Sequence, residues 1–169
     1  MKPLGILLAS AAVLLATQAA FAQRDAGAKI RGEYSFHGNA AGSAIRSARD
    51  TSSYYRQYAQ SAPEKKVEPA TAREAADTIG TYITKAQKHM AWMRKQAAGS
   101  NDKETLTSLD SIDKHLAAAA KSHDDMKETC LKDNVDAAAS MECCKTIDDH
   151  LAKAIGEHDK LMKRVAAKK

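Results

Sequence analysis

Histidines and cysteines recur in the last third of the chain at spacings of seven and eight residues. In order, they are His115, His123, Cys130, Cys143, Cys144, His150 and His158. Imidazole nitrogens and thiolate sulfurs are the usual ligands of zinc and of copper. The pattern therefore raises the hypothesis of a transition-metal site, provided that the elements carrying these residues bring them together.

The second half of this pattern repeats the first in reverse order, as expected of two antiparallel helices joined by a short turn. Residues equally far from the turn then lie at one level. The expected pairs are Cys130 with Cys143, His123 with His150, and His115 with His158. Successive pairs would lie about 11 Å apart at ~1.5 Å of rise per residue, so one ion could not join two pairs.

The expected metal ligands are four histidines, with one methionine and the cysteines as possible contributors. They are His115, His123, His150, His158, Met126, Cys130, Cys143 and Cys144. Met126 is included because it lies three residues after His123, on the same helix face. Imidazole, thioether and thiol together favour copper, with zinc next.

Two histidines are not assigned to this site. His89 falls on a neighbouring helix, where we expect it to point away from His115, although Met93 follows it by four residues. His37 precedes the first expected helix, and its position is not predicted.

The cysteines have a second interpretation. In an exported protein, Cys130 and Cys143 could form a disulfide across the turn, and closing a loop of this size stabilises a fold by ~3 kcal/mol in the chain-entropy model. The remaining cysteine could then bind metal, pair with a second chain or be inert.

Three rival functions follow from the same residues. The main rival is a disulfide-stapled structural or protein-interaction bundle without metal, in which the histidines are polar interface residues. A minor rival is non-covalent haem binding by two histidines in an alanine-rich core. Paired histidines could also act as a protonation switch below pH ~6.5. No catalytic or nucleotide-binding motif occurs, so we do not expect an enzyme.

The fold prediction comes from four segments in which apolar or small residues repeat every three and four positions, the pattern of one buried helix face. The positions are Ala41, Ile45, Ala48, Ser52, Tyr55 and Ala59; Ala76, Ile79, Ile83, Ala86, Met90, Met93 and Ala97; Leu109, Ile112, Leu116, Ala119 and Met126; and Ile147, Leu151, Ala154, Leu161 and Val165. The segments predict an all-α, antiparallel up-down-up-down four-helix bundle over residues 40–169. Its helices are expected near 40–60, 71–97, 103–131 and 137–166.

The first 22 residues are typical of a signal peptide. Lys2 precedes a short apolar run, and Ala20, Phe21 and Ala22 fit an A-x-A cleavage site. The run is too short for a good membrane anchor. We therefore expect a periplasmic or secreted protein that begins with an irregular lead-in over residues 23–39.

Charge limits the choice of partners. The 26 basic and 21 acidic residues are interspersed, and no basic cluster alternates with aromatic residues. Nucleic acid is therefore not an expected partner. A metal ion is the expected ligand, and a second copy of the chain or another protein is a possible partner.

Overall fold

The computed structural model describes residues 6–130 and 135–167, with side chains described for 32–129 and 135–167. The described residues are almost all helical. The helices are α1 (Ile6–Ser61), α2 (Pro69–Gly99), α3 (Lys103–Cys130) and α4 (Ala137–Ala167). A short 3-10 helix (Pro63–Lys65) and two strands, β1 (Lys66–Val67) and β2 (Val135–Asp136), lie between them.

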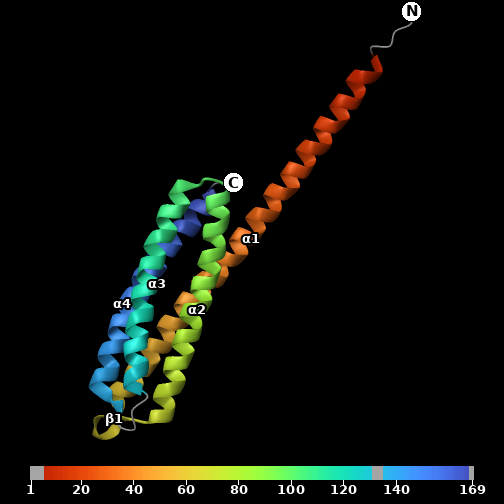
Figure 1. Ribbon diagram of the computed structural model, residues 1–169. Helices are drawn as coiled ribbons and strands as arrows, with labels where there is room; N and C mark the ends of the chain where they lie inside the picture. The colour runs from red at the N-terminus through yellow and green to blue at the C-terminus, as the bar shows by residue number, and fades with distance from the viewer. Residues whose placement is uncertain (1–5, 131–134, 168–169) are drawn as a thin grey trace, which may run out of the picture. The chain divides into compact units, whose positions relative to one another are not determined.

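The chain divides into two compact units, Met1–Phe36 and His37–Lys169. The second unit contains the C-terminal part of α1 together with α2, α3 and α4, which lie side by side as a four-helix bundle (Figure 1). The first unit contains the N-terminal part of α1. No helix within the described residues is both long enough and apolar enough to cross a membrane.

Residues 23–39 differ from the sequence prediction, because they belong to α1 and do not form an irregular lead-in. No proline lies between Pro3 and Pro63 to interrupt the helix. The isolated glycines of this stretch each cost only about 1 kcal/mol relative to alanine, which alanine-rich surroundings can offset. The signal peptide over residues 1–22 stays a prediction.

The bundle core is the predicted apolar stripe. Every described stripe position is buried except Val165, which is half-buried. The largest fully buried side chains include Ile45, Ile79, Leu116 and Leu151, one from each helix. Spacing of three and four residues therefore identified the inward face of all four helices.

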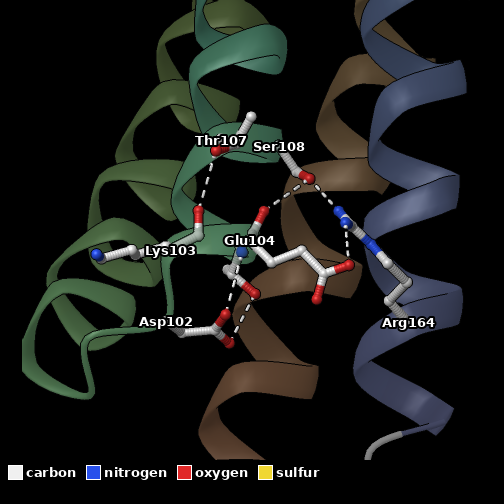
Figure 2. Close-up of polar contacts among 7 residues, drawn as sticks. Asp102, Lys103, Glu104, Thr107, Ser108 and Arg164 are labelled. Carbon is white, nitrogen blue, oxygen red and sulfur yellow. Dashed lines mark hydrogen bonds and ion pairs between the residues drawn. The ribbon is translucent and has the colours of Figure 1, made fainter.

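Two aspartates cap the first turns of helices. Asp102 accepts hydrogen bonds from the backbone N–H and the hydroxyl of Thr105, at 3.1 and 2.9 Å, and so caps α3 (Figure 2). Asp136 accepts from the backbone N–H of Ala139 at 2.7 Å and caps α4. Each cap satisfies an N–H that the first helical turn leaves without an intrahelical partner.

The loops at one end of the bundle are tied together. Lys66 and Val67 of β1 pair with Asp136 and Val135 of β2 in a two-stranded antiparallel ladder. Both valines are buried and cover that end of the core. The ladder therefore links the α1–α2 connection to the start of α4.

Ion pairs link neighbouring helices near the other end. Arg164 of α4 contacts the Glu104 carboxylate at 3.0 Å and also donates to the Ser108 hydroxyl, both on α3 (Figure 2). Arg94 of α2 contacts Asp110 and Asp113 of α3, each at 2.7 Å. These contacts hold α3 against both of its neighbours.

Polar contacts also join α1 and α4. The Ser52 hydroxyl donates to the Cys144 carbonyl at 3.2 Å, and Arg56 contacts the buried Asp148 carboxylate at 3.2 Å. Burial raises the pKa of Asp148, although the positive charge of Arg56 acts in the opposite direction. The α1–α4 seam is therefore partly polar.

Candidate functional site

The histidine pairs on α3 and α4 differ from those expected. His115 faces His150, with ring centroids 6.0 Å apart. The mirrored spacing had paired these residues with His158 and His123 instead. Because α3 ends at Cys130 and α4 begins at Ala137, the centre of the turn lies earlier in the chain than that spacing assumed.

His123 points from α3 toward α2. Its Nε2–H donates to the Ala76 carbonyl at 2.8 Å, and the ring lies against Gly80, where a Cβ atom would come within 2.7 Å of it. The Nδ1 atom lies 3.6 Å from the Asp124 carboxylate. A carbonyl only accepts, so this hydrogen bond fixes the tautomer with hydrogen on Nε2.

His158 repeats this arrangement between α4 and α1. Its Nε2–H donates to the Gly38 carbonyl at 2.8 Å, and its Nδ1 lies 3.4 Å from the carboxylate of the next residue, Asp159. The ring packs against Gly42, leaving no room there for a Cβ atom. We call His123 and His158 the clamp histidines, because each joins two helices through a backbone carbonyl beside a glycine.

Two of the other predicted ligands on this hairpin are in contact with each other. The Cys144 thiol contacts the Met126 thioether at 3.9 Å, and both residues are fully buried. Cys143 is a half-buried free thiol whose pKa is raised by burial and then by the charges of Asp125 and Glu142. The Cys130 side chain lies outside the described residues, and the structure does not support the predicted Cys130–Cys143 disulfide because Cys143 is a free thiol.

His115 and His150 form a loose pair. Burial, and then the charges of His150, Lys153 and Lys114, lower the pKa of His115, while Glu157 acts in the opposite direction. The buried Nδ1 of His150 has no hydrogen-bond partner among the described residues. The two rings are therefore neighbours, with an interplanar angle of 33°.

The two histidines that sequence reasoning set aside make the closest imidazole contact. His37 of α1 and His89 of α2 lie with their Nδ1 atoms 2.9 Å apart. One ring must donate its Nδ1–H to the Nδ1 lone pair of the other, because two lone pairs would repel at this distance. We call these residues the histidine pair.

Trp92 fixes the orientation of one member of the pair. Its ring stacks on the His37 ring at a centroid distance of 4.0 Å and an interplanar angle of 8°. Burial lowers the pKa of His89, as do the charges of His37, Lys88 and Lys85. His89 is therefore held in the neutral form that metal ligation requires over a wider pH range than a free imidazole.

Two methionines lie beside Gly38, the residue after His37. A Cβ atom added at Gly38 would collide with the Met162 thioether and would lie 3.6 Å from the Met93 methyl carbon. Gly38 directly follows His37, and Met93 lies one helical turn after His89. Helices α1, α2 and α4 thus bring two imidazoles and two thioethers into one region of the bundle.

The sequence contains a signal for this site that the lead-in prediction obscured. Continuing the stripe of Ala41 and Ile45 backward by four and seven residues reaches His37 and Gly38. Had the first helix been extended, His37 would have fallen beside the core and near α2.

Within the described residues, no group of three or more His, Cys, Asp or Glu side chains could hold a metal ion.

Comparison with known proteins gives no match to a family model, to a curated protein or to a solved structure.

Proposed function

We propose that this protein is an exported helical bundle that binds a transition-metal ion, copper or zinc, at the histidine pair His37 and His89. The observation that carries the proposal is the 2.9 Å separation of the two Nδ1 atoms. Two nitrogens bound tetrahedrally to one ion at ~2.0–2.1 Å lie about 3.3 Å apart, so the two Nδ1 atoms would separate by a few tenths of an ångström while each ring turns its lone pair toward the ion.

The surrounding structure favours ligation by this pair. Trp92 restrains the His37 ring, and the lowered pKa of His89 keeps its imidazole neutral. Binding would move the shared hydrogen from Nδ1 to Nε2, leaving both Nδ1 atoms on the ion. The role that fits such a site is buffering, sensing or resistance in the cell envelope, without catalysis.

The proposal includes the finer topology of the bundle, antiparallel and up-down-up-down. It is supported by contacts between early residues of one helix and late residues of the next. Asp77 contacts Lys127 at 3.8 Å, and Arg94 contacts Asp113 at 2.7 Å.

A zinc titration followed by tryptophan emission tests the site. Trp92 is the only tryptophan and stacks on His37, so ligation should change its emission. We expect the change to saturate at about one equivalent and to disappear in the double variant His37→Gln, His89→Gln.

The matched control is His115→Gln with His150→Gln, which removes the looser pair. This variant should keep the Trp92 response. Loss of zinc binding in the control variant, with binding retained in the His37→Gln, His89→Gln variant, would return the site to the α3–α4 hairpin and contradict the proposal.

A structural or protein-interaction bundle is the second candidate. It is favoured by a groove of about 380 Å³ between α1 and α2, where the tyrosines Tyr54 and Tyr58 are 70% and 38% exposed. Tyrosine is enriched in protein interfaces. If neither zinc nor copper binds, this function takes precedence. Haem binding stays a prediction.

A further inference from the structure

We infer that the ion bound at the histidine pair is monovalent copper, with the thioethers of Met93 and Met162 completing its ligand set. This inference rests on the proposed function and names the metal for the same site. The predicted ligands included neither Met93, which lies on α2, nor Met162, which lies on α4 of the hairpin predicted to hold the metal.

The first argument is the position of the two thioethers. The Met162 thioether lies so close to the Cα of Gly38 that no residue with a Cβ atom would leave room for it. The Met93 methyl carbon lies 3.6 Å from the position that this Cβ would take. Met93 is fully buried and Met162 half-buried, so both lie where water is largely excluded. Each has rotatable bonds that let its sulfur turn toward a neighbouring ion.

The second argument is how this part of α1 is held. His158 donates to the Gly38 carbonyl at 2.8 Å, and Met162 lies one turn further along α4. Trp92 stacks on His37 from α2. The segment His37–Gly38 is therefore fixed between two helices, each of which also supplies a methionine.

The third argument is the chemistry of the ligand set. Neutral thioethers are soft ligands that select monovalent copper, whereas zinc is satisfied by imidazole with water or carboxylate. Two imidazoles and two thioethers bring no negative charge, which suits a monovalent ion better than a divalent one because less charge is left uncompensated in a partly buried site.

The test is a pair of titrations of the full chain without oxygen, followed by Trp92 emission. Monovalent copper is delivered as its bathocuproine disulfonate complex, and zinc is titrated separately. Because the readout is local to His37, copper taken up by the thiol of Cys143 would not change it.

In the double variant Met93→Leu, Met162→Leu, we expect the affinity for monovalent copper to fall on the order of 100-fold and that for zinc to change by less than about threefold. Leucine conserves the side-chain volume, and circular dichroism and thermal unfolding check the fold of each variant. The control is Met126→Leu, a fully buried methionine that contacts Cys144, and it should keep both affinities.

The outcomes separate this inference from the proposed function. If zinc changes the Trp92 emission but monovalent copper does not, the metal assignment is wrong and the site stands. If the leucine variant keeps its copper affinity, Met93 and Met162 are not ligands and the inference is overturned. If neither ion changes the emission, both the inference and the proposed function fail.

Discussion

The clamp histidines and the histidine pair lie in the same bundle but differ in what their ring nitrogens face. His123 and His158 each direct Nε2–H at a backbone carbonyl, whereas His37 and His89 direct Nδ1 at each other. A carbonyl already engaged in a helix accepts the additional hydrogen bond through its second lone pair. The clamps therefore use their N–H for packing against backbone, and the pair places two ring nitrogens next to each other.

The difference has a local cause. Each clamp ring lies against a glycine, Gly80 or Gly42, which lets imidazole approach the helix backbone. His37 meets a second imidazole across the α1–α2 interface and is supported by Trp92. Whether a histidine between helices is structural or available for ligation thus depends on the residue it faces, and its heptad position alone does not decide this.

The largest expected effect is on zinc affinity, compared between a variant of the histidine pair and a variant of a clamp histidine. His37→Gln with His89→Gln should lower the affinity for zinc by on the order of 100-fold or more, because both nitrogen ligands are lost. His123→Gln should leave zinc affinity within about threefold, since its Nε2 is engaged by Ala76. Calorimetry measures both. Equal losses in the two variants would remove the distinction between clamp and pair.

The second effect is on stability, which should depend more on the clamp histidines than on the histidine pair. His123→Ala and His158→Ala should each lower the free energy of unfolding by about 2–3 kcal/mol, because a buried ring and its hydrogen bond are lost. His37→Ala should cost less, since that side chain is only half-buried. Urea unfolding followed by circular dichroism provides the comparison. Losses below about 0.5 kcal/mol at both clamps would show that they do not hold the helices.

A substitution at the glycine next to a clamp histidine tests the same packing contact. Gly80→Ala should destabilise the protein by about 1–2 kcal/mol, because the new methyl group displaces His123 and this outweighs the better helix propensity of alanine. The control is Gly156→Ala on α4, where nothing lies within 4 Å of the added Cβ. That variant should be more stable by about 0.5–1 kcal/mol. Stabilisation by Gly80→Ala would contradict the clamp geometry.

The smallest effect is on the pH dependence of stability. The pKa values of His89 and His115 are lowered, mainly by burial, from an ordinary value of 6.5. Below that value the unfolded chain binds more protons than the folded one, so stability should fall as the pH decreases from 6.5 toward the folded pKa values. Above 6.5 both states are neutral and the contribution vanishes.

Urea unfolding between pH 5 and pH 7.5 measures this dependence. His89→Gln and His115→Gln should each flatten the profile on its acidic side. An unchanged slope in both variants would show that neither imidazole is harder to protonate in the folded state.

Much of the fold could be predicted from the sequence. The stripe residues other than Val165 are buried, and α3 and α4 begin at Lys103 and Ala137, where the sequence prediction placed their starts. Helix faces are predictable because burial of an amphipathic stripe is a local pattern that dominates helix stability. The start of α1 was not predictable in the same way, because scattered glycines and aromatic residues only weaken a helix.

The candidate site was harder to predict, since it depends on register and not on periodicity. A shift of a few residues in the turn centre separated His115 from His158 and placed it beside His150. His37 was missed because its segment had been assigned to no element. Which atom a buried histidine faces is determined by neighbouring helices, and here Gly80 and Gly42 decided it for the clamps.

The central claim is that His37 and His89 bind metal while His123 and His158 hold helices together. Long-range ¹H–¹⁵N spectra of the six histidine rings during a zinc titration test it most directly. We predict that the Nδ1 signals of His37 and His89 shift to metal-bound values with hydrogen on Nε2, while His123 and His158 keep Nε2–H throughout. Shifts at His115 and His150 with none at His37 and His89 would contradict it.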